Sequence, residues 1–177
     1  NGACGLCDPC IAGLPAHCKE RRVLGIRHLD GLFAEFVTAK IKTLHVVPPD
    51  VSDEKAVFVE PLAAACEVSQ LVHVHPNDSV VVLGGGRLGL LVALVLRLTG
   101  CDVTVLGRRA SSLARASALG LKTALSGNWE TRRGADVVVE CTGSPEGFDL
   151  ACQFVRPRGT VVLKSTYAAP LAQDLNR

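Results

Sequence analysis

A glycine-rich turn between two apolar segments constrains the fold of this chain most. Residues 79–83 (SVVVL) form a short β-branched run, residues 84–89 (GGGRLG) match G-x-G-x-x-G, and residues 88–100 (LGLLVALVLRLTG) form a longer apolar stretch. The run predicts a strand buried on both faces, and the stretch predicts a buried helix. Glycines at this spacing let a strand turn sharply, let the backbone approach a pyrophosphate and let the helix pack on the strand. A turn without a ligand is the alternative, but the flanking strand and helix favour a dinucleotide site. The residues predicted to bind the cofactor here are Gly84, Gly85, Gly86, Arg87, Leu88 and Gly89.

Three further apolar runs extend this pattern: residues 102–107 (DVTVLG), 136–143 (DVVVECTG) and 159–165 (GTVVLKS). Helical stretches separate the first three of the four runs. This alternation predicts an α/β fold with a Rossmann-type, doubly wound parallel sheet. Ligands bind at the carboxyl ends of the strands in such sheets, so Thr142, Gly143, Lys164 and Ser165 are further candidates for cofactor contacts.

The end of the second predicted strand indicates which dinucleotide is bound. NAD sites usually carry an acidic residue there to bind the ribose 2′-hydroxyl. This chain instead has Gly107, which leaves room, followed by Arg108 and Arg109, which offer permanent charges to a 2′-phosphate. The pattern favours NADP, while NAD with two merely solvated arginines remains the alternative.

Four cysteines near the N-terminus, Cys4, Cys7, Cys10 and Cys18, have the spacing C-x2-C-x2-C-x7-C. Such a cluster is compatible with a metal lobe, a disulfide pair or an iron–sulfur site. The dinucleotide domain indicates a reducing, cytoplasmic compartment, where disulfides are rare, and four thiolates suit a closed structural zinc site. We interpret His17 as a surface residue. The other cysteines, expected as small buried hydrophobes, are Cys66, Cys101, Cys141 and Cys152.

Charge and hydropathy exclude several partners. The formal net charge is only +2, with basic and acidic residues mixed, so nothing favours nucleic acid or a membrane surface. The apolar run at residues 88–96 is well short of the roughly 20 residues that span a bilayer. Small molecules are therefore the expected partners. The chain has no methionine, and we interpret it as part of a longer polypeptide.

The chain changes character near Pro48 and Pro49. Residues 30–48 alternate apolar and polar side chains and predict half-buried antiparallel strands. Residues 51–72 then carry apolar residues at helical spacing, with a helix start at Ser52 or Asp53. We place the domains at residues 1–58 and 59–177.

The order of a four-cysteine lobe, a DGLFAEFV…LHVVP strand pair, an EPLAAA helix and a Rossmann unit resembles the zinc-containing medium-chain alcohol dehydrogenases, most closely their polyol and threonine dehydrogenase branch. The resemblance implies that residues 1–58 are part of a β-rich, GroES-like catalytic domain with a structural-zinc lobe. It also implies that Glu60, in VEPLAAA, is a ligand or neighbour of the catalytic zinc. The alternative for Glu60 is a carboxylate that only stabilises a helix start.

Other features of that family are missing. Its remaining catalytic-zinc ligands, a cysteine and a His-Glu pair, precede the structural lobe, and its nucleotide sheet continues beyond residue 177. The resemblance thus implies the central part of a homo-oligomeric enzyme in which zinc activates a primary or secondary alcohol or polyol for hydride transfer to NAD(P). On this interpretation the isolated chain is inactive. Two alternatives are a non-catalytic NADP-binding module or degenerate relative, and a zinc-knuckle interaction protein, although the lobe lacks the basic and aromatic residues of nucleic-acid knuckles.

Overall fold

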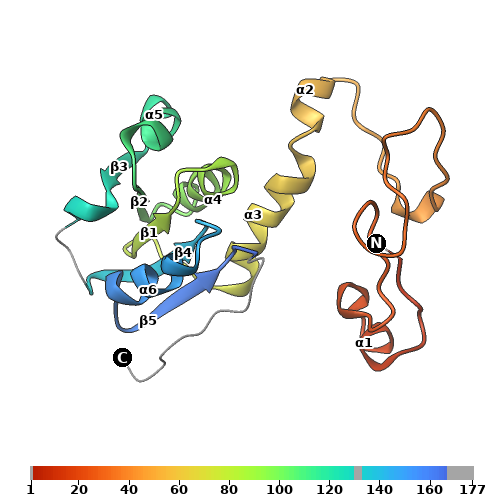
Figure 1. Ribbon diagram of the computed structural model, residues 1–177, viewed down its shortest axis with the longest axis horizontal. Coiled ribbons are helices and arrows are strands. Elements are labelled where there is room, and N and C mark those ends of the chain that lie inside the picture. Colours follow the sequence, from red (N-terminus) through yellow and green to blue (C-terminus); the bar gives the residue numbers. More distant parts are fainter. Residues whose placement is uncertain (1, 130–132, 167–177) are drawn as a thin grey trace. The chain divides into compact units, whose positions relative to one another are not determined.

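The computed structural model describes residues 2–129 and 133–166. The chain divides into two compact units, one up to Val51 and one from Ser52 onward (Figure 1). The domain boundary predicted between residues 58 and 59 stays a prediction.

The second unit is built on a five-stranded sheet in the order β3-β2-β1-β4-β5, with all neighbouring strands parallel. Its strands are β1 (Ser79–Leu83), β2 (Asp102–Gly107), β3 (Lys122–Leu125), β4 (Ala135–Glu140) and β5 (Val155–Leu163). The chain proceeds outward from β1 to β3 in one direction and then from β4 to β5 in the other. This confirms the predicted parallel α/β sheet, and its strand order reverses between β1 and β4, where such sheets bind ligands.

Helices cover both faces of the sheet (Figure 1). Side chains of α3 (Val59–Leu71), α4 (Arg87–Arg97) and α5 (Ala110–Ala118) pack with Val80 and Val82 of β1. The helix α6 (Pro145–Phe154) packs instead with Val81 and Leu83 on the other face. Successive side chains of a strand point to opposite faces, so a run of apolar residues serves two cores at once.

Two elements of the sheet unit lie outside the predicted set, β3 and α6. The strand β3 has only four residues and pairs with β2 at the edge of the sheet. The helix α6 follows Ser144 as its N-cap residue and has a proline in its first turn. Both features are typical helix-start signals.

The first unit contains short helical turns: α1 (Asp8–Ile11), η1 (Pro15–His17) and η2 (Ile41–Thr43). The antiparallel strands predicted for residues 30–48 do not form, so that prediction was wrong. Within the described residues this segment pairs with no other strand, and Phe33, Phe36 and Val46 lie exposed. Alternation of side chains can create a strand only where a partner accepts its backbone hydrogen bonds.

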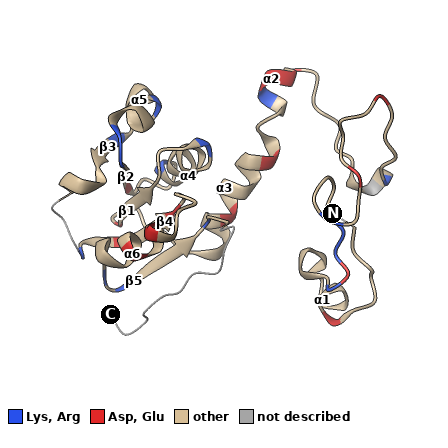
Figure 2. Ribbon diagram, viewed as in Figure 1, with Lys and Arg blue, Asp and Glu red and all other residues tan. Residues whose placement is uncertain are grey.

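The segment after the two prolines follows the prediction more closely. The helix α2 (Asp53–Ala56) begins after Ser52, and α3 follows it. Charged residues of both signs are interspersed along the chain (Figure 2). Among the residues that the structure describes, no helix is both long enough and apolar enough to cross a bilayer.

Candidate cofactor and metal sites

A cavity of about 180 Å³ opens at the carboxyl ends of β1, β2 and β4. Three turns form its walls: the β1–α4 turn (residues 84–86), the β2–α5 turn (residues 108–109) and the β4–α6 turn (residues 141–144). The residues that line it are Leu83, Gly84, Gly85, Gly86, Leu106, Gly107, Arg108, Arg109, Ser112, Ser126, Cys141, Thr142, Ser144, Glu146, Gly147 and Leu150. The structure therefore brings together candidates that are far apart in the sequence.

The glycines of the β1–α4 turn meet different surroundings. Gly84 has φ +104°, and a Cβ atom there would lie 2.8 Å from the carbonyl oxygen of Cys141. A Cβ atom at Gly89 would overlap the carbonyl oxygen of Gly84. At Gly86, by contrast, an added Cβ would meet nothing within 4 Å. Packing thus requires glycine at 84 and 89, whereas Gly86 leaves free space inside the cavity, as close approach of a ligand to the backbone demands.

The helix α4 begins at Arg87, with Gly86 as its N-cap residue. Its first backbone N–H groups have no partner within the helix, so they can donate to an anion. Arg87 and Leu88, also predicted at the cofactor, do not line the cavity. Arg87 is exposed, and Leu88 packs against the core between α4 and the sheet.

The β2–α5 turn supplies the positive charge of the cavity. Both Arg108 and Arg109 line it, and within the described part of the chain no carboxylate lies within 4 Å of either guanidinium. A Cβ atom at Gly107 would lie 2.7 Å from Ser112 Oγ and 2.9 Å from Leu113 Cδ2. A side chain at 107 would therefore require the side chains of Ser112 and Leu113 to shift.

The β4–α6 turn forms the opposite wall. Thr142 donates to Glu140 Oε1 from its backbone N at 2.6 Å and from Oγ1 at 2.5 Å. Glu146 accepts a hydrogen bond from the Ser144 hydroxyl, and this bond, its own backbone N–H and the charge of Arg108 lower the pKa of its carboxyl group. Hence one carboxylate faces the two arginines across the cavity.

The remaining strand-end candidates lie next to this wall. Gly143 N donates to Ser165 Oγ at 2.8 Å, and Lys164 N donates to the backbone oxygen of Glu140 at 2.9 Å. None of Gly143, Lys164 and Ser165 lines the cavity itself.

Sequence reasoning missed several residues of this region, among them Ser112, Glu140, Ser144 and Glu146. A signal for Glu140 exists, since it is an acidic residue that directly continues the apolar run of β4. The N-cap pattern at Ser144 is a similar signal for the start of α6.

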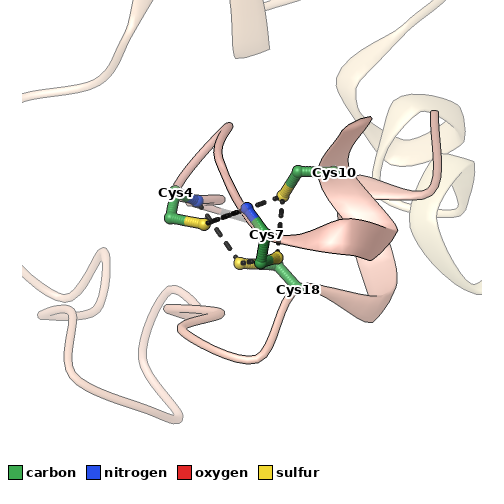
Figure 3. A group of neighbouring side chains, drawn as sticks. All are labelled: Cys4, Cys7, Cys10 and Cys18. Carbon is green, nitrogen blue, oxygen red and sulfur yellow. Dashed lines mark hydrogen bonds between the residues drawn. The ribbon is translucent and has the colours of Figure 1, made fainter. Parts of the chain in front are cut away.

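The four N-terminal cysteines converge as predicted from their spacing (Figure 3). All four sulfur atoms lie within 4.8 Å of one another. The Sγ atom of Cys7 lies 3.5 Å from that of Cys10 and 3.8 Å from that of Cys18, and Cys4 Sγ lies 4.0 Å from Cys10 Sγ. A tetrahedron with zinc–sulfur bonds of about 2.3 Å has sulfur–sulfur edges of about 3.8 Å. The cluster therefore fits a closed four-thiolate zinc site.

Backbone amides support negative charge on two of these sulfurs. Hydrogen bonding from the Cys10 backbone lowers the pKa of Cys7 to about 6, and bonds from the backbones of Leu6 and Cys7 lower the pKa of Cys4. Loss of hydration raises the pKa of Cys10 to about 12. Zinc binds the thiolate form of cysteine, which the lowered pKa values favour at Cys4 and Cys7, while Cys10 would lose its proton when the metal binds.

The other metal candidate, Glu60, is exposed in the first turn of α3. Among the described residues, the cysteine cluster is the sole group of three or more His, Cys, Asp or Glu side chains arranged to hold a metal. The role of Glu60 stays a prediction.

The expected burial of the other four cysteines was partly wrong. Cys101 is buried and donates to the backbone oxygen of Leu96, and Cys141 lines the cavity, where burial raises its pKa to about 12. Cys66 and Cys152 are exposed instead. Each follows a buried alanine, Ala65 or Ala151, and one step along a helix turns a side chain by about 100°, away from the core.

Comparison with known proteins identifies the family. The family model described as zinc-binding dehydrogenase matches residues 88–176, about half of the chain. The chain belongs to the zinc-binding dehydrogenase family. Its relatives include a 2-dehydro-3-deoxy-L-galactonate 5-dehydrogenase from Pseudoalteromonas atlantica, 32% identical over 97% of this chain, and a sorbitol dehydrogenase from Halalkalibacterium halodurans, 31% identical over 96%. The chain spans 53% of each relative, which is about half of its length.

Two solved structures show the same fold. A zinc-binding dehydrogenase from Sinorhizobium meliloti bound to NADP superposes with a TM-score of 0.86 at 28% identity, and the match covers 98% of this chain and 55% of that one. An alcohol dehydrogenase from Escherichia coli in complex with NADH gives a TM-score of 0.84 at 28% identity, over 97% of this chain and 53% of the other. The two relatives hold different dinucleotides, so family membership alone leaves the choice between NAD and NADP open.

Proposed function

We propose that this chain forms the nucleotide-binding region and the structural-zinc lobe of a zinc-dependent alcohol or polyol dehydrogenase. The observation that carries the proposal is the cavity at the carboxyl ends of β1, β2 and β4, lined by the glycine turn and by two arginines. The names of the relatives, several of them dehydrogenases of sugar alcohols or sugar acids, support a polyol or related alcohol as the substrate class.

Each part of the cavity has a role in this proposal. Backbone N–H groups at Gly85 and Gly86 and the start of α4 hold the pyrophosphate, because the turn leaves space and the helix N-terminus attracts an anion. The β4–α6 turn, which contains Thr142, forms the wall on the β4 side of the cavity. When bound, the dinucleotide supplies the hydride acceptor for the alcohol, or the donor for the carbonyl compound. Glu60 is proposed to lie beside the catalytic zinc.

We further propose that NADP is the preferred cofactor. Arg108 and Arg109 line the cavity at the end of β2, and no carboxylate follows that strand where an NAD site usually has one. A 2′-phosphate carries nearly two negative charges at neutral pH, and guanidinium groups bind phosphate oxygens with charge-assisted hydrogen bonds. Such a bond is worth about 1.5 to 3 kcal/mol, or roughly a tenfold or greater change in affinity.

The test replaces both arginines by alanine and compares the Kd values of NADP and NAD. We expect the unmodified chain to bind NADP at least about tenfold more tightly and the Arg108→Ala, Arg109→Ala variant to lose that preference. Added salt should reduce the preference, because exposed charges are screened. Gly107→Asp is a poorer test, since a side chain at 107 would collide with Ser112 and Leu113.

Arg115→Ala is the matched control for this experiment. Arg115 lies in the last turn of α5, is exposed and does not line the cavity, so its loss changes the net charge without touching the site. Equal binding of NAD and NADP by the unmodified chain, or an unchanged preference in the double variant, would show that the arginines are only a solvated turn.

A further inference from the structure

A fully buried carboxylate lies at the place where the strand order reverses. Glu140 ends β4, has 0% of its surface exposed and pairs in register with Leu83 of β1 and Leu163 of β5. The three residues before it, Val137 to Val139, are buried and apolar. A carboxylate is costly to bury unless hydrogen bonds compensate for its lost hydration, so its contacts carry information about its role.

Those contacts lead into the wall of the cofactor cavity. Glu140 Oε1 accepts the two bonds from Thr142, at 2.6 Å from the backbone N and at 2.5 Å from Oγ1. Thr142 Oγ1 in turn accepts a bond from Ser144 N at 3.1 Å. The carboxylate thereby fixes the β4–α6 turn through the backbone and the side chain of Thr142.

The first turn of α6 packs closely against this carboxylate. A Cβ atom at Gly147, in the first turn of α6, would lie 2.5 Å from Glu140 Oε1 and would overlap Thr142 Oγ1. The start of α6 can therefore approach the pair only because residue 147 has no side chain. Both Thr142 and Gly147 line the cavity.

The β4–α6 turn also touches the β1–α4 turn. Cys141 N donates to the backbone oxygen of Leu83 at 2.8 Å, directly before the glycine turn. A Cβ atom at Gly84 would lie 2.8 Å from Cys141 O and 3.2 Å from Thr142 Cα. The two turns thus pack backbone against backbone.

We propose that Glu140 is a positioning residue that acts through Thr142 to hold the β4–α6 wall of the cavity in its dinucleotide-binding geometry. The nature of the ligand rests on the function proposed above, whereas the ordering of the turn does not. Glu140 contributes a buried hydrogen-bond acceptor and does not itself line the cavity.

The test uses the full chain with Glu140→Ala, Glu140→Gln and Thr142→Val. Thr142→Val removes the hydroxyl group at nearly constant volume, which keeps the experiment informative if Glu140→Ala fails to fold. Asp136→Asn is the matched control: Asp136 lies in the first half of the same strand and accepts bonds from Ser79 N at 2.8 Å and Arg156 Nε at 2.6 Å, away from the cavity.

The first measurement is amide hydrogen exchange of the nucleotide-free chain. We expect the amide of residue 142 to exchange about tenfold faster in Glu140→Ala, which removes its acceptor. In Thr142→Val we expect the same of the amide of Ser144, because that change removes the hydroxyl group that accepts its hydrogen bond. Glu140→Gln, which keeps an acceptor oxygen, should restore most of the protection. Asp136→Asn should leave these amides unchanged even if its melting temperature falls.

The second measurement is the Kd of NADPH, followed by the quenching of Trp129, the one tryptophan of the chain. We expect about tenfold weaker binding in Glu140→Ala and Thr142→Val, a double variant no worse than the weaker single one, and wild-type affinity in Asp136→Asn. Failure of the unmodified chain to bind nucleotide would refute the proposed function, while the exchange data would still decide the role of Glu140. Unchanged exchange in both Glu140→Ala and Thr142→Val would overturn the positioning role.

Discussion

At the scale of single residues, Gly86 and Gly89 belong to one motif but answer to different physical demands. A Cβ atom at Gly89 would overlap the carbonyl oxygen of Gly84, whereas one at Gly86 would meet no protein atom within 4 Å. Gly86 has extended backbone angles, φ −78° and ψ −172°, which any residue can adopt. Of these two glycines, only Gly89 is therefore needed for the fold itself.

This contrast leads to a pair of substitutions that separate folding from binding. Gly89→Ala should destabilise the chain by about 1 to 3 kcal/mol, because the added methyl group forces α4 away from β1. Gly86→Ala should change stability by less than about 1 kcal/mol but weaken nucleotide binding about tenfold or more, since its methyl group occupies ligand space. Urea unfolding and nucleotide titration measure the two effects. A stable Gly86→Ala variant with wild-type affinity would contradict the proposed pyrophosphate position.

At the scale of elements, the cysteine lobe has very little apart from its sulfur atoms to hold it together. Its helical turns have only three or four residues, too short to be stable alone. Among the described residues up to Val51, Cys18 is the sole buried side chain. A lobe without a hydrophobic core needs another source of order, and a structural zinc supplies one because its binding energy becomes folding energy.

We therefore expect one zinc ion for each chain, held by Cys4, Cys7, Cys10 and Cys18. Cys10→Ser should abolish stoichiometric zinc, measured by elemental analysis, because a neutral hydroxyl group replaces one of the four thiolates. The sheet unit has its own core, so its circular dichroism and cooperative unfolding should survive both this change and a chelator. Cys66→Ser, at an exposed cysteine outside the cluster, is the control and should keep its zinc. Full zinc content in Cys10→Ser would disprove the assignment.

Elements also show where sequence patterns are sufficient. The β-branched runs at β1, β2 and β4 predict their strands because a strand buried on both faces must be apolar throughout. The run in β5 gives a similar signal, although that edge strand is only partly buried. The strand β3 is shorter and only half-buried, so its sequence carries little signal. Residues 30–48 show the opposite error, since their alternating pattern describes what a partner strand would stabilise, and the described chain provides no such partner.

At the scale of the whole molecule, the position of the cavity could be predicted because the parallel topology of the sheet determines which turns lie together. Parallel strands place their carboxyl ends at one edge of the sheet, so the β1–α4, β2–α5 and β4–α6 turns had to meet there. What the sequence could not supply was the set of contacts within that edge. The bond from Thr142 to Glu140, and the close approach of the Ser112 and Leu113 side chains to Gly107, depend on distances that no spacing rule encodes.

This chain alone is not expected to hold a catalytic zinc. A catalytic zinc site needs about three protein ligands and an open position, and the described residues offer no metal cluster besides the four cysteines, whose coordination shell is already complete. Glu60 alone cannot hold the ion. We therefore expect residues 1–177 to bind NADP but to show no NADP-dependent oxidation of sorbitol or other polyols, even with zinc added.

The comparison is a longer polypeptide that spans the full length of the relatives, of which this chain covers 53%. It should turn over, and Glu60→Gln in it should lower kcat with little change in the Kd of NADP, because Glu60 is proposed to act at the zinc and not at the nucleotide. Absorbance of the reduced cofactor follows the reaction in both proteins. Turnover by residues 1–177 alone would refute the proposed division of labour, and a longer polypeptide that binds NADP without turnover on any alcohol would favour a non-catalytic nucleotide-binding module.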